Sequence, residues 1–132
     1  MDESFYFCQN LKQIEIPPNS ELISIGKKAF YNTSIKKITF PPNLTLIGQS
    51  AFLHCKKLKE IEFLTNHEVL TIESNAFNSS PIETILTPEN TQLKILGDDA
   101  FHNSSINYFH VPDSFKKIKQ FNLMLVFTIY QI

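Results

Sequence analysis

The sequence is short of several features that define common classes of protein. Its 132 residues hold two cysteines, three glycines and no tryptophan, and its basic and acidic residues nearly balance at a net charge of −1. Two cysteines cannot form a disulfide scaffold. A balanced charge also argues against a nucleic-acid-binding protein, which needs a clustered basic surface. The longest apolar stretch, residues 121–132, is too short to span a membrane. The chain is long enough for one domain.

Signals for export and for catalysis are missing as well. Residues 1–4 are acidic and lack the basic start and apolar core of a signal peptide, which predicts a cytoplasmic location by default. No nucleophile elbow, phosphate loop or paired acidic motif occurs. The four histidines show no metal-ligand spacing: His54, His67, His102 and His110. We therefore predict that the chain is not an enzyme and that it binds no cofactor or metal.

What the sequence does contain is a repeat of about two dozen residues. The dipeptide Ala-Phe occurs at 29–30, 51–52, 76–77 and 100–101, with Ser-Phe at 4–5 as an imperfect copy. An apolar pair three residues apart stands before each full copy, and a second pair follows it. The last position of the second pair recurs at steps of 24, 23, 24 and 24: Ile14, Ile38, Ile61, Ile85 and Phe109. A fixed period in this range is typical of a solenoid.

One unit can be interpreted physically. A short strand comes first, a single helical turn carries Ala-Phe, and a polar turn leads into a second strand that ends at proline. The phenylalanines should stack as a ladder through the core: Phe5, Phe30, Phe52, Phe77 and Phe101. Each glycine follows the first apolar pair, which predicts either a positive φ or a close approach between coils. Cys8 and Cys55 share one repeat position, and we expect both to be small buried hydrophobes.

The second strands should pair in parallel between successive units, centred on the five residues of the apolar column. Alternation then directs two columns of side chains outward: Gln13, Lys37, Glu60, Thr84 and Tyr108, and Glu15, Thr39, Glu62, Leu86 and His110. The first half of these columns is charged, whereas Tyr108 and Leu86 make the second half a candidate hot spot. The predicted partner-binding residues are Lys37, Glu60, Glu62, Leu86, Tyr108 and His110. An ordinary solvated face, or a partner on the turns around Asn32, Asn78 and Asn103, remains open.

The apolar, proline and Ala-Phe positions of residues 11–30 and 41–61 resemble the BspA-like leucine-rich repeat, also called the Treponema pallidum type. The resemblance extends over about residues 4 to 118. It implies a mostly β leucine-rich-repeat solenoid with a parallel concave sheet, short second strands and single helical turns. It also implies protein–protein interaction or adhesion at a cell surface, and no catalytic residues.

We expect a leucine-rich-repeat domain over residues 1–120, with about five repeats and incomplete ends, and an apolar tail over 121–132 that could cap the last coil. We expect uncovered apolar side chains at both ends of the stack: Phe5, Phe7 and Leu11 at one end and residues 115–132 at the other. Such ends predict self-association. Two alternatives remain. One is a partial or truncated repeat protein without an autonomous role. The other is a hydrolase on a β-solenoid, for which Glu60 and Glu62 are the nearest acidic pair.

Overall fold

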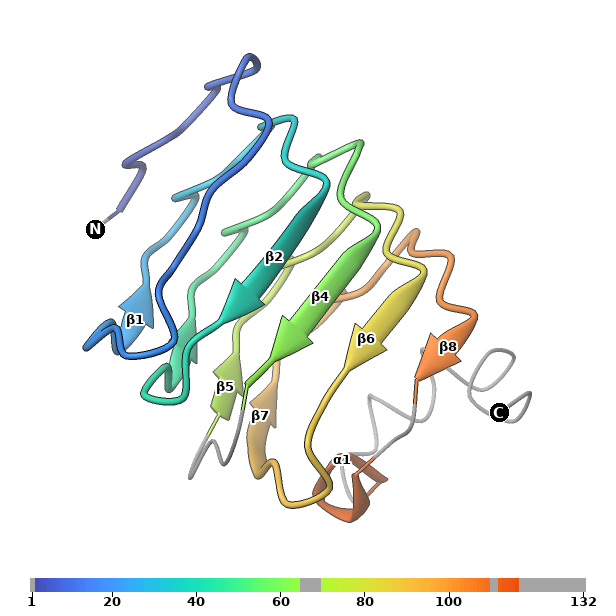
Figure 1. Ribbon diagram of the computed structural model, residues 1–132. Coiled ribbons are helices and arrows are strands. Elements are labelled where there is room, and N and C mark those ends of the chain that lie inside the picture. Colours follow the sequence, from blue (N-terminus) through green and yellow to red (C-terminus); the bar gives the residue numbers. More distant parts are fainter. Residues whose placement is uncertain (1, 65–69, 110–111, 117–132) are drawn as a thin grey trace.

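The computed structural model describes residues 2–64, 70–109 and 112–116, and the chain winds as a stack of coils (Figure 1). One parallel sheet runs in the order β1 (Ser24–Ile25), β3 (Leu46–Ile47), β5 (Leu70–Ile72) and β7 (Leu93–Leu96). The other runs in the order β2 (Lys37–Phe40), β4 (Glu60–Phe63), β6 (Thr84–Leu86) and β8 (Tyr108–Phe109). A single helical turn, α1 (Asp113–Lys116), follows. The predicted mostly β solenoid with parallel sheets is confirmed.

The register of the second sheet follows the repeat period. Ile38 pairs with Ile61, Ile61 with Ile85, and Ile85 with Phe109, and all four side chains are buried. Each strand therefore pairs with the next unit rather than within its own unit. The strand predicted around Ile14 is wrong, because the described residues contain no strand before β1. That segment lies in the outermost described coil and runs into Pro17 and Pro18, which have no amide hydrogen to donate to a neighbouring strand.

The phenylalanine ladder is confirmed. Neighbouring rings lie 5.0–5.2 Å apart between centroids, and their planes are within 13° of parallel. Phe52 and Phe77 are fully buried in the middle of the ladder, whereas Phe5 at its end is half-buried. A second aromatic contact joins Phe40 to Phe63 at 4.9 Å on the next strand over. The ladder and the apolar column form one continuous core.

The segment around each Ala-Phe differs from the predicted helical turn. It consists of tight turns, such as the one closed by a hydrogen bond from Ala29 N to Gly26 O at 3.2 Å. Residues in the left-handed backbone region cannot be part of a right-handed helix, and they interrupt each described coil at two positions. The residues with positive φ are Glu3, Phe7, Lys28, Asn32, Ser50, His54, Asn75, Ser79, Asp99 and Asn103.

The glycines have a different role from these left-handed residues. None of the glycines has a positive φ, so that half of the prediction is wrong. The close approach between coils is confirmed at two of them. A Cβ added at Gly48 would lie 2.8 Å from Ile25 O, and one added at Gly97 would lie 2.1 Å from Ser74 N. Glycine is present there because the backbone of the preceding coil leaves no room for a side chain.

The two cysteines have different environments, so the prediction is confirmed for Cys55 and wrong for Cys8. Cys55 is fully buried, its Sγ donates to Phe30 O at 3.0 Å, and burial raises the pKa of its thiol. Cys8 is exposed because it belongs to the outermost described coil. In the described part of the chain, no helix has the length and apolar character needed to cross a membrane. The predicted tail, 121–132, lies outside the described residues, and the predicted domain division stays a prediction.

Candidate functional site

Seven of the ten residues predicted to point outward come together on one face. Gln13 and Glu15 precede β1 and belong to no strand, and His110 lies outside the described residues. The register aligns Lys37, Glu60, Thr84 and Tyr108 in one row across β2, β4, β6 and β8. A second row aligns Thr39, Glu62 and Leu86. We call the surface formed by these seven residues the outer face. Five of the six predicted binding residues belong to it, and the sixth, His110, lies outside the described residues.

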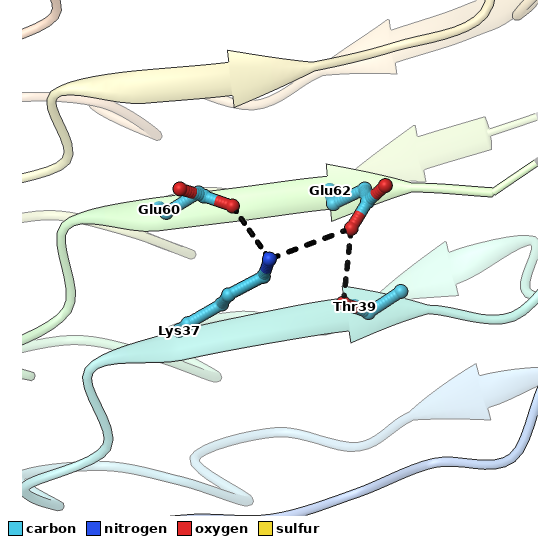
Figure 2. Close-up of polar contacts among 4 residues, drawn as sticks. All are labelled: Lys37, Thr39, Glu60 and Glu62. Atoms are coloured by element: carbon cyan, nitrogen blue, oxygen red, sulfur yellow. Dashed lines mark hydrogen bonds and ion pairs between the residues drawn. The ribbon is translucent and has the colours of Figure 1, made fainter.

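The charged half of the outer face is a connected network (Figure 2). Lys37 Nζ lies 2.7 Å from Glu60 Oε1 and 3.7 Å from Glu62 Oε2. Thr39 Oγ1 donates to Glu62 Oε2 at 3.3 Å. The hydrogen bond to Glu60, together with the charges of both carboxylates, raises the pKa of Lys37 against a partial opposing effect of burial. One lysine therefore contacts both carboxylates, and the three side chains present one polar network to solvent.

The other half of the outer face is less polar. Tyr108 is 49% exposed, although its neighbour in the strand, Phe109, is buried. Leu86 and Thr84 are half-buried beside it. The strand alternation explains this difference, because successive side chains point to opposite sides of the sheet. An exposed tyrosine near an aliphatic side chain is the kind of surface that protein partners use.

Reasoning from the sequence missed an aromatic cluster on the turns of the first coils. Tyr6 and Tyr31 stack at 4.9 Å, Phe7 lies 5.4 Å from Tyr31, and His54 meets Tyr31 edge-on at 5.7 Å. Lys28 Nζ lies 5.7 Å from the centre of the Tyr6 ring, within cation–π range. The repeat alignment held the signal, because Tyr6 and Tyr31 each follow a ladder phenylalanine directly.

No group of three or more histidine, cysteine, aspartate or glutamate side chains in residues 2–64, 70–109 and 112–116 is placed to hold an ion. Of the four histidines, His67 and His110 lie outside those ranges. His54 packs on an aromatic ring, and His102 is an exposed turn residue.

Comparison with known proteins places the chain in a family. The pattern of the BspA type leucine rich repeat region matches residues 1–124 in six copies. No curated protein sequence matches the chain. The crystal structure of the pneumococcal vaccine antigen PcpA is similar, with a TM-score of 0.64 and 26% identity over 74% of this chain. This chain spans 24% of that protein. A leucine-rich repeat protein from Bacteroides ovatus aligns over 86% of this chain and 40% of its own, with 22% identity and a TM-score of 0.44. The chain belongs to the BspA-type leucine-rich-repeat family.

Proposed function

We propose that the chain is a non-enzymatic protein-interaction module whose partner binds the outer face around Tyr108 and Leu86. The observation that supports this most is the exposure of Tyr108, which is 49% exposed and lies at the end of the first row of the outer face. Tyrosine gives a large contact area at little cost in rotamer entropy, so it is favoured where proteins meet.

The scaffold supports the same proposal. Strands paired across β2, β4, β6 and β8 hold their outward side chains in fixed rows, so a partner meets a preformed surface. The network of Lys37, Glu60 and Glu62 would set orientation and specificity, since exposed charges contribute more to those than to affinity. The family resemblance favours adhesion at a cell surface as the setting for this interaction.

A pair of variants with equal exposure tests the proposal. Tyr108 on β8 and Ile95 on β7 are both 49% exposed, but they belong to different sheets. The whole chain would be used as bait on an extract of its native source, and the captured protein would then be titrated. We expect Tyr108→Ala to weaken binding about tenfold or more and Ile95→Ala to change it by less than about twofold. Equal binding by all three chains would contradict the proposal, and circular dichroism would show that each variant is folded.

A further inference from the structure

A groove opens where the first described coil separates from the second sheet. Residues 12–18 run beside β2 (Figure 1), but no backbone hydrogen bond joins them to it. The coil is attached on either side of this opening. Ser34 N donates to Leu11 O at 2.9 Å, and Thr45 N donates to Ile23 O at 2.9 Å. The groove has a volume of about 680 Å³ and is lined by residues 12–18 on one side and by Lys36, Lys37 and Thr39 on the other.

The wall formed by β2 is an open strand edge. Leu64 N donates to Phe40 O at 3.1 Å, and Phe40 pairs with Phe63 in the register. In a parallel ladder, alternate residues direct both backbone groups to the same neighbour. Ile38 and Phe40 therefore bond to β4, and the N–H and C=O groups of Lys37 and Thr39 point into the groove. Such an edge is a ready template for another strand.

The other surfaces of the groove include two apolar side chains and two lysines, besides Lys37, which is already paired with Glu60 and Glu62. Ile14 and Ile16 are half-buried, pack against the core and line the groove. Lys12 and Lys36 are exposed, and neither forms an ion pair with any described residue. Of the residues that line the groove, Glu15 alone carries a carboxylate, and it accepts a hydrogen bond from Gln13 Nε2 at 2.9 Å.

We propose that this groove binds an extended segment of a partner protein, with alternating acidic and apolar residues, as an added strand on β2. Main-chain bonds to Lys37 and Thr39 would supply affinity, as in other cases of strand addition. One set of side chains would pack on Ile14 and Ile16, and the other would meet Lys12 and Lys36. This site shares Lys37 and Thr39 with the outer face, but Tyr108 lies three strands away on β8. It goes beyond the proposed function and does not depend on it.

Two other occupants of the β2 edge would give a different pattern of amide hydrogen exchange. Residues 12–18 could close onto β2, or a second copy of the chain could cover it. Hydrogen exchange at the amides of Lys37 and Thr39 separates these cases. We expect fast exchange in the free chain at every concentration and slow exchange once a peptide is bound. Protection in the free chain, whether constant or rising with concentration, would overturn the proposal.

A direct test uses a fluorescent hexapeptide of alternating glutamate and valine as the probe, with the full chain. Thr39→Pro removes the amide that faces the groove and leaves the bonds of Ile38 and Phe40 to β4 in place, as proline on an edge strand can. Thr39→Val is the matched control, because it keeps the amide and loses only the hydroxyl. We expect Thr39→Pro to weaken binding about tenfold or more and Thr39→Val to change it by less than about twofold.

Three further measurements complete the test. The double change Lys12→Gln with Lys36→Gln should weaken binding about fivefold and flatten its dependence on salt. A peptide methylated on alternate backbone nitrogens should fail to bind the unaltered chain, which tests the mechanism even where Thr39→Pro does not fold. Tyr108→Ala should bind the peptide normally. Absence of peptide binding, equal binding of the methylated peptide, or loss of binding in Tyr108→Ala would each overturn the proposal.

Discussion

The hydroxyl of Ser80 donates a hydrogen bond to the carbonyl oxygen of Phe52, 2.5 Å away and one coil earlier in the chain. The thiol of Cys55 makes the same bond to Phe30 O, at 3.0 Å, between the preceding pair of coils. Ser80 Oγ also accepts from Cys55 N at 3.1 Å. Small polar side chains therefore join the backbone of two ladder phenylalanines, Phe30 and Phe52, to the coil that follows each of them.

Replacing Ser80 tests these hydrogen bonds. Ser80 is fully buried, so Ser80→Ala takes a partner from two buried backbone groups and should cost about 1–3 kcal/mol of unfolding free energy. Ser80→Cys should recover much of that loss, since cysteine already makes this bond at position 55. Urea unfolding of the three chains measures both effects. Equal losses in the alanine and cysteine variants would show that the bond is not what stabilises the site.

The phenylalanine ladder predicts unequal losses along its length. Phe52 is fully buried between Phe30 and Phe77, with ring centroids at 5.0 and 5.1 Å. Phe52→Ala should therefore open a cavity and cost about 3–5 kcal/mol. Phe5 is half-buried and stacks on Phe30 alone within the described ladder, so Phe5→Ala should cost clearly less. Thermal unfolding of both variants compares them, and equal losses would contradict a ladder with an open end.

The cysteines should differ in reactivity. Cys8 is exposed, whereas burial raises the pKa of the Cys55 thiol and keeps it protonated. The thiolate is the reactive form, so iodoacetamide should label Cys8 in the folded chain and reach Cys55 only after unfolding. Peptide mapping by mass spectrometry identifies the labelled residue. Labelling of both residues at similar rates in the folded chain would be incompatible with the burial of Cys55.

The same pKa shift predicts how stability depends on pH. A thiol whose pKa is raised in the folded state holds its proton at a pH where the unfolded thiol has lost it. The unfolded state then gains from ionisation, so stability falls as pH rises above the ordinary value of 9.0. Cys55→Ser removes this titration. The chain with Cys55 should lose stability relative to Cys55→Ser between about pH 8 and pH 10. Urea unfolding of both chains at the two pH values measures this, and an equal difference in stability at both would refute it.

The apolar N-terminal end of the stack predicts self-association. Tyr6 and Phe7 are 39% and 49% exposed, and Leu11 is half-buried. A solenoid end that leaves apolar side chains in water tends to find another copy. Sedimentation velocity of the whole chain should show a mass that rises with concentration, and Phe7→Ser should reduce that rise. A constant monomer mass over a wide concentration range would reject the prediction.

Much of the interior follows from the sequence because each inner coil has a neighbour on both sides. The steps between Ile38, Ile61, Ile85 and Phe109 fix the register, and the register decides which side chains point outward. The outermost coil does not follow in the same way. Cys8 shares a repeat position with Cys55, yet it is exposed because no described coil covers its outer side. Ile14 shares one with Ile38, yet its segment forms no strand and runs into Pro17 and Pro18.

The turns were harder to predict for a different reason. Positive φ occurs at lysine, serine and phenylalanine as well as at asparagine, so residue type alone does not reveal it. Repeated bonds between coils, such as Phe30 N to Ala51 O at 2.8 Å, hold these turns in place. The outer face was predictable as a set of residues, whereas the ion pairs of Lys37 and the groove beside β2 depend on geometry that a periodic pattern does not contain.

The most direct test of the outer face is a photo-reactive cross-linker placed at position 108. Benzoyl-phenylalanine would replace Tyr108 in one chain and the equally exposed Ile95 in another, and each would be irradiated with the partner captured by the unaltered chain. We predict a cross-linked product from position 108 and none from position 95. A product from position 95 alone would contradict the placement of the partner on the β2-β4-β6-β8 sheet.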